Sequence, residues 1–148
     1  MRIVLQRVKH AAVCADGVVT GSIAQGFLIL VGFAPADTEE TVRRMLDKVL
    51  RLRIFSDEND KINLSLSDVG GTLLVVSQFT LYADCHKGNR PNFIGAAPPK
   101  QAAELYQFCL GYCRRQGFET QAGVFGADMQ VSLCNDGPFT VVLDSETL

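Results

Sequence analysis

The first 33 residues constrain the fold most, because they have the pattern of consecutive β-strands. The segments Ile3–Val8 and Val13–Ile23 are apolar and rich in β-branched residues, and the second contains Asp16-Gly17. An Asp-Gly pair between apolar runs is the strongest short-range signal of a β-hairpin, since both residues tolerate positive φ. The continuous apolar run Gly26–Phe33 has the length of a strand and predicts one that is buried on both faces.

Two segments have the spacing of amphipathic helices. We expect Asp37 to cap the first helix, with Glu40 three residues later completing a capping box. The second helix should begin at Pro98-Pro99 and end near Gly117. The apolar stripes of the two helices are, in order, Val42, Met45, Leu46 and Val49, then Leu105, Phe108, Cys109 and Tyr112.

Further strands complete the pattern. Short strands are expected at Ile54-Phe55 and Thr72–Val76, and two more at Met129–Cys134 and Phe139–Leu143. Between them, Tyr82–Pro98 is a long polar loop, and long loops in compact domains often carry function. The order of elements predicts a single α+β domain over residues 1–148, β-rich and mainly antiparallel, with two main helices.

Charge and cysteine content narrow the class of protein. A net charge of −2 argues against a protein that neutralises a long run of phosphates, although it does not exclude contact with a nucleic-acid end. Five cysteines without a Cys-x-x-Cys pair favour a reducing compartment. No segment has the pattern of a signal peptide or the ~20 apolar residues that span a bilayer. We therefore expect a cytoplasmic protein without membrane contact.

The chain offers few side chains for acid–base or nucleophilic chemistry. It has only two histidines, His10 and His86, and neither stands near a serine-protease signature. Cys85 beside His86 is a weak candidate for a thiol and its base, because neighbours on a loop rarely face each other. Cys109 and Cys113, four residues apart, fit a helix core better than a metal site. We expect no metal and no cofactor, so that catalysis would rest on backbone dipoles and the substrate.

Two polar segments stand out at the ends of predicted strands. Ser77-Gln78-Phe79-Thr80-Leu81 follows a buried strand, where polar side chains are costly unless they are hydrogen-bonded. It either caps the strand or forms a polar cup whose backbone amides stabilise an oxyanion. Asn135-Asp136-Gly137-Pro138 is first a turn between two strands, and its Gly-Pro bond can be cis.

Together these segments closely resemble the D-aminoacyl-tRNA deacylases, also called D-tyrosyl-tRNA deacylases. The resemblance covers essentially the whole chain. It includes Gln6-Arg7-Val8, Leu52–Asp57, Val75–Leu81, Arg90–Phe93 and Ala127–Leu133.

The resemblance implies a barrel-like α+β fold that dimerises through its sheets. It implies an ester hydrolase that removes D-amino acids or glycine from the 3′ end of aminoacyl-tRNA, a proofreading step in translation. Ser77, Gln78, Phe79 and Thr80 would form the catalytic pocket, with Thr80 as a nucleophile or a positioning residue. A cis Gly137-Pro138 pair from the partner subunit would hold the α-amino group and reject L side chains. The remaining substrate-binding residues would be Arg7, Met129 and Asn135.

Three points stay open. The family usually has a small residue after the proline, where this chain has Phe139; its effect depends on whether it points to the core or the pocket. Lys87, Arg90 and Lys100 are candidates for phosphate contacts. Two other functions remain: a deacylase for L-amino acids, favoured by a trans Gly137-Pro138 bond, and a non-catalytic nucleic-acid-binding module, favoured by a pocket without free amides near Thr80.

Overall fold

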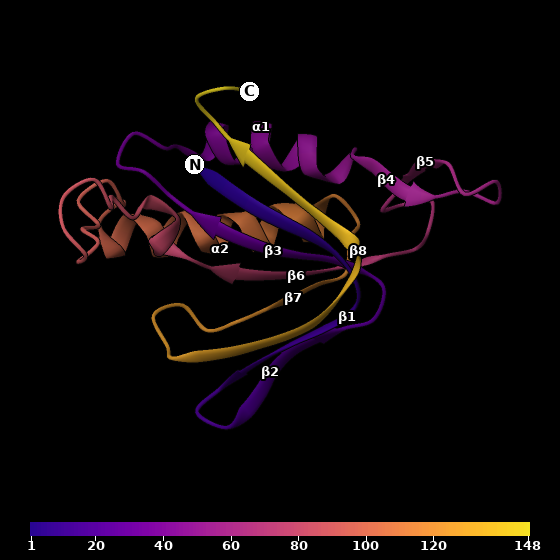
Figure 1. Ribbon diagram of the computed structural model, residues 1–148, viewed down its shortest axis with the longest axis horizontal. Coiled ribbons are helices and arrows are strands. Elements are labelled where there is room, and N and C mark those ends of the chain that lie inside the picture. Colours follow the sequence, from indigo (N-terminus) through magenta and orange to yellow (C-terminus); the bar gives the residue numbers. More distant parts are fainter.

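Strand β1 (Arg2–Ala15) organises the fold, because it is long enough to pair with three other strands. A computed structural model describes residues 1–148 (Figure 1). The first half of β1 pairs with β3 (Gly26–Gly32) and its second half with β2 (Val18–Ile23). Strand β8 (Met129–Asp144) runs along the whole of β1. The predicted hairpin is confirmed, since Asp16 and Gly17 have φ of 49° and 77° between β1 and β2.

The rest of the sheet is parallel. Strand β6 (Thr72–Ser77) pairs with β3, and β7 (Thr120–Ala122), which the sequence pattern did not predict, pairs with β6. Parallel neighbours need crossover connections. Helix α1 (Glu39–Leu50) and the hairpin of β4 (Arg53–Ser56) and β5 (Ile62–Ser65) connect β3 to β6, and helix α2 (Pro99–Arg115) lies between β6 and β7. The carboxyl ends of β3, β6 and β7 therefore lie at one edge of the sheet.

The curled sheet buries apolar residues on both of its faces. Helices α1 and α2 cover one face, where the predicted stripe of α1 packs with residues such as Ile3, Phe27 and Val75. A smaller cluster that includes Val8 and Leu74 fills the inside of the curl. Burying each such side chain contributes roughly 1.5–3 kcal/mol to stability. Since β3 lies between the two clusters, its predicted burial on both faces is confirmed.

The predicted cap of the first helix was wrong by one residue. Thr38 is the N-cap, and its side chain and that of Thr41 form the capping box with each other's backbone amides. Asp37 is buried instead, and its carboxylate accepts hydrogen bonds from the Met1 ammonium at 2.7 Å and the Ala34 amide at 2.6 Å. A buried carboxylate needs such partners, so the ion pair takes precedence over capping.

The chain end was predicted as two strands joined by a turn, and this was also wrong. Both parts belong to β8 and pair with β1, with Asn135 opposite Val8 and Thr140 opposite Gln6. The residues between them bulge out of the ladder. Because β1 continues past this point, the chain does not reverse, and the extra residues form a bulge as in other antiparallel pairs.

Helix α2 begins at Pro99 as predicted, and Gly117 follows its end with φ of 89°. Its buried face is rotated from the prediction: Phe108 and Tyr112 are half-buried, whereas Tyr106 and Leu110 are buried. Cys109 and Cys113 lie in the core, as expected. Neither helix is long and apolar enough to cross a membrane.

Candidate functional site

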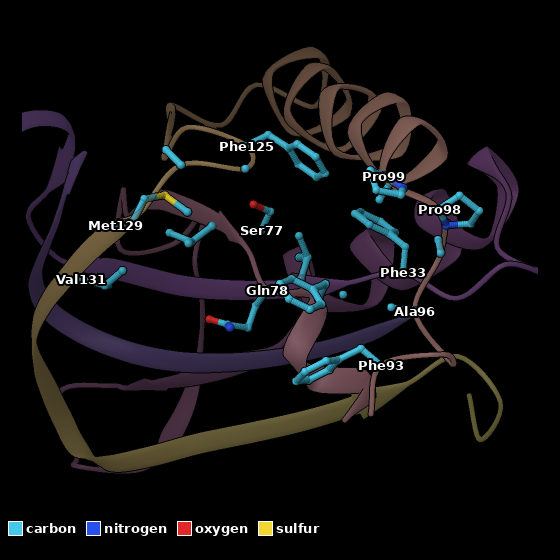
Figure 2. Close-up of a pocket in the computed structure, with 18 of the residues that line it drawn as sticks. Phe33, Ser77, Gln78, Phe93, Ala96, Pro98, Pro99, Phe125, Met129 and Val131 are labelled. Carbon is cyan, nitrogen blue, oxygen red and sulfur yellow. The ribbon is translucent and has the colours of Figure 1, made fainter. Parts of the chain in front are cut away.

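A cavity of about 690 Å³ lies where the three parallel strands end. The ends of β3 and β6 contribute Phe33 and Ser77, and the segment after β7 contributes Phe125. Figure 2 shows Phe125 beneath α2 and Pro99 at the start of this helix, with Gln78 and Phe93 across the cavity. Ligand sites in sheets with parallel strands commonly lie at these carboxyl ends, where the connecting loops diverge. The prediction from sequence missed Phe33 and Phe125, because a single apolar residue after a strand carries no signal.

The lining of the cavity is mostly apolar and holds no titratable side chain. Its polar side chains are those of Ser77 and Gln78 alone, and 13 of its 19 residues are hydrophobic. Tyr106, which packs near Phe125 behind the wall, donates its hydroxyl to the Val75 carbonyl at 2.8 Å. Burial raises the pKa of Tyr106 to about 12, so this hydroxyl stays protonated at neutral pH. The cavity therefore offers backbone dipoles rather than an acid or a base.

The segment Ser77–Leu81 forms the polar end of the cavity. The Gln78 amide donates to the Val31 carbonyl at 2.7 Å and extends the pairing of β6 with β3. The chain then turns into a short 3₁₀ helix, η1 (Phe79–Tyr82). The first amides of such a turn have no acceptor inside it. The amides of Phe79 and Thr80 therefore have no acceptor within η1, and Phe79 also lines the cavity.

A glycine allows this turn to approach β3. A Cβ atom added to Gly32 would lie 2.8 Å from the Gln78 carbonyl oxygen and 3.2 Å from the Leu81 Cβ. Backbone atoms cannot come that close without moving. The position of the turn therefore depends on the absence of a side chain at residue 32.

Thr80 itself is exposed and does not line the cavity. Its hydroxyl oxygen accepts a hydrogen bond from the side-chain amide of Gln78. No imidazole or carboxylate contacts it. This arrangement favours a positioning role for Thr80 over that of an activated nucleophile.

Two aromatic rings form the rim of the cavity. Phe79 and Phe93 meet edge to face with 5.0 Å between their centroids, and Phe79 is 57% exposed. An exposed ring at the mouth of a cavity can stack on a nucleic-acid base. Met129 of β8 lies at the opposite end of the cavity, so the structure brings Met129 together with three of the four predicted catalytic residues.

The second polar segment lies outside this cavity. The Gly137-Pro138 bond is cis, both residues are exposed, and neither lines the cavity of its own chain. The bulge is held from behind by Arg7, whose guanidinium donates to the carbonyls of Asp136 at 2.9 Å and Ile54. Asn135 also supports it, because its side chain bonds the Arg7 and Phe139 carbonyls and the Phe139 amide. Arg7 and Asn135 therefore stabilise the bulge that carries Gly137 and Pro138, and neither residue lines the cavity.

Phe139 points toward the core. Its ring lies 4.7 Å from the Arg7 guanidinium carbon and packs against the helix-side cluster. On the structure, the larger residue after the proline therefore supports Arg7 and does not narrow the cavity.

The weak thiol–imidazole candidate on the long loop is not formed. The His86 Nδ1 atom lies 2.8 Å from the Asp84 carboxylate, and both residues are exposed. Hydrogen bonds from the amide and ring of His86 lower the pKa of Asp84. The His86 ring therefore forms its hydrogen bond with Asp84 and not with the Cys85 thiol.

Comparison with known proteins covers nearly the whole chain. The family model described as D-Tyr-tRNA(Tyr) deacylase matches residues 4–144. D-aminoacyl-tRNA deacylases of Clostridium perfringens (strain SM101) and Desulfatibacillum aliphaticivorans are each 51% identical over 146 residues, with 99% of this chain covered and 98% and 100% of theirs.

Two solved structures have the same fold. The c-Myc DNA Unwinding Element Binding Protein superposes with a TM-score of 0.91 at 38% identity, covering 97% of this chain and 98% of its own. A probable eukaryotic D-amino acid tRNA deacylase superposes with a TM-score of 0.83 at 19% identity, covering 96% and 97%. The second likeness concerns the fold alone.

Proposed function

Since the chain belongs to the D-Tyr-tRNA(Tyr) deacylase family, we propose that it hydrolyses the ester between a D-amino acid, or glycine, and the 3′-terminal adenosine of a tRNA. One observation supports this function above the others. The cavity at the carboxyl ends of β3, β6 and β7 combines an exposed aromatic rim with the amides of η1 and lacks titratable side chains. It suits a nucleoside ester that needs an oxyanion site and no protein base. We place this activity in the cytoplasm.

In the proposed reaction, water attacks the carbonyl carbon of the ester. The amides of Phe79 and Thr80 donate to the developing oxyanion, and such donors contribute about 10²–10³ in rate. The bond to the ribose oxygen then breaks, and that oxygen takes up a proton to give the free 3′-hydroxyl and the amino acid. The neighbouring 2′-hydroxyl of the substrate assists the water, since the cavity has no base to do so. Gln78 keeps Thr80 oriented at the site.

We assign the discrimination between D and L substrates to the Gly137-Pro138 pair of a second subunit. The carbonyls of Gly137 and Pro138 would accept the α-ammonium group of the substrate, leaving no room for an L side chain. These residues are exposed and lie outside their own cavity, which supports assigning them to the cavity of a neighbouring copy. Met129 would contact the substrate from the wall of the cavity.

A homodimer is supported by the surface of β8. This strand pairs with β1 on one side and has no strand on the other. Val142 on this strand is 69% exposed. Long edge strands with apolar side chains are usually covered by a partner. Light scattering should give twice the 16.1 kDa of one chain. A monomer with full D-selective activity would contradict the cross-subunit site.

The function is tested with matched D- and L-tyrosyl-tRNA. We expect release of D-tyrosine at a rate at least 100-fold above that of L-tyrosine, a difference of about 2.7 kcal/mol in transition-state binding. Release of L-tyrosine alone would indicate the L-deacylase alternative. Binding of tRNA without release of either amino acid would indicate a non-catalytic module.

A further inference from the structure

The positive charges of the chain are concentrated on its two helices. Helix α1 with its C-cap Arg51, together with α2, holds seven of the 14 Lys and Arg residues but only four acidic ones. Because the whole chain carries −2, this helix layer carries +3 and the remainder −5. A surface of this sign on an acidic protein favours a polyanionic partner on that side.

The two helices bring their cations together at one place. The guanidinium carbons of Arg43, from α1, and Arg115, from α2, lie 5.2 Å and 5.6 Å from the centroid of the Phe108 ring. The Phe108 ring stacks on Tyr112, whose hydroxyl donates to Asp47 at 2.5 Å. The Asp47 carboxylate therefore accepts a hydrogen bond from Tyr112. The Phe108 ring keeps the guanidinium groups of Arg43 and Arg115 close together at the surface.

Few of these charges are neutralised within the protein. Among the helix cations, only Arg43 has acidic partners, the exposed Glu39 at 3.4 Å and Glu40 at 3.7 Å. Lys48 and Arg115 stand in last helical turns, where they also complement the helix dipoles. Arg51 and Arg115 are exposed and form no salt bridge, so both are available to phosphates. Guanidinium groups suit phosphate contacts especially well.

Helix α2 connects the cavity to this surface. Its first residues, Pro99 and Ala102, line the cavity, and its 17 residues extend about 25 Å at about 1.5 Å each. A stacked strand of nucleic acid rises about 3.4 Å per nucleotide, so the short unpaired 3′ end of a tRNA covers less than this length. A paired stem that follows α2 away from the cavity would therefore reach the second half of this helix.

We propose that the helix layer binds the phosphate backbone of the acceptor stem of the tRNA whose 3′ end occupies the cavity. This inference rests on the proposed function, and Arg51 and Arg115 are its main contacts. Contacts to phosphates carry no information on base sequence, so the helix layer contributes affinity for any acceptor stem and no preference for sequence.

The experiment compares two substrates of different length. D-tyrosyl-tRNA has the stem, whereas the D-tyrosyl ester of adenosine has only the part that enters the cavity. Changing Arg51→Gln and Arg115→Gln together should lower kcat/KM about tenfold on the tRNA, roughly three- to fourfold per lost phosphate contact. The slope of log kcat/KM against log salt should become shallower by about one for each cation removed. The adenosine ester should be cleaved at the unchanged rate.

Two control proteins test whether the effect depends on the charge of these side chains and on their position in the helix layer. The pair Arg51→Lys and Arg115→Lys keeps the charges and should retain most of the activity on tRNA. The pair Lys9→Gln and Lys61→Gln removes the same charge from exposed positions outside the helix layer and should have little effect. A tRNA-specific loss in this control pair alone, or an equal loss on both substrates in the helix pair, would overturn the proposal. If the unchanged protein cleaves neither substrate, the proposed function fails instead.

Discussion

Replacing Gly32 with alanine is expected to lower kcat on D-tyrosyl-tRNA about 100-fold with a much smaller change in KM. The new Cβ would lie 2.8 Å from the Gln78 carbonyl oxygen, so the turn that carries the Phe79 and Thr80 amides must move by several tenths of an ångström. Oxyanion donors act on the transition state, and small displacements of aligned groups cost rates of this order. Steady-state kinetics on the purified protein measures the effect.

Gly21→Ala is the matched control for this change. A Cβ atom at Gly21 would lie 2.8 Å from the Ala122 carbonyl oxygen, which is the same crowding against backbone but away from η1. Both variants should lose about 1–3 kcal/mol of stability through overpacking. If the two proteins lose stability alike and Gly32→Ala keeps the kcat of Gly21→Ala, the oxyanion site does not depend on this turn.

The second large effect is expected for Arg7→Met. The Arg7 side chain is 11% exposed, donates to the Asp136 and Ile54 carbonyls, and lies 3.5 Å from the Asp136 carboxylate. Removing one partner of such a buried arrangement costs about 3–5 kcal/mol. For a chain of this size that corresponds to a fall in Tm of roughly 10 °C. Because the bulge that carries Gly137 loses its support, we also expect the ratio of D to L hydrolysis to fall at least tenfold.

Arg2→Met is the control for Arg7. Arg2 also bonds a carbonyl, that of Leu81, pairs with a carboxylate, that of Asp144, and stacks on a ring, that of Tyr82, but its side chain is 40% exposed. Its loss should cost about 1 kcal/mol and leave the D to L ratio unchanged. An equal drop in Tm for the two variants, with selectivity intact in both, would refute the role given to Arg7.

The local elements were predictable from sequence because their signals are local. An Asp-Gly pair favours the positive φ of a two-residue hairpin turn, as Asp16 and Gly17 show, and the spacing of Val42, Met45 and Val49 is a property of one helix. Strand β7 is only three residues long, and its existence depends on pairing with β6, so no local pattern marks it. The capping error at Asp37 has the same origin, since the partner of that carboxylate is 36 residues away at Met1.

For the candidate site, too, some features were visible in the sequence and others depended on the assembled fold. The amino-acid sequence marked Ser77–Leu81 and Gly137-Pro138 as candidate site segments, because polar and turn residues stand there at strand ends and the two segments together resemble those of the D-aminoacyl-tRNA deacylases. The assembled fold was needed to show that three parallel strands end at one cavity, and that the Gly-Pro pair is a bulge of β8 outside this cavity. Strand pairing and side-chain packing join residues that are distant in the chain, and their energies depend on the assembled sheet. The Phe139 side chain points toward the core because its ring packs against the Arg7 guanidinium group.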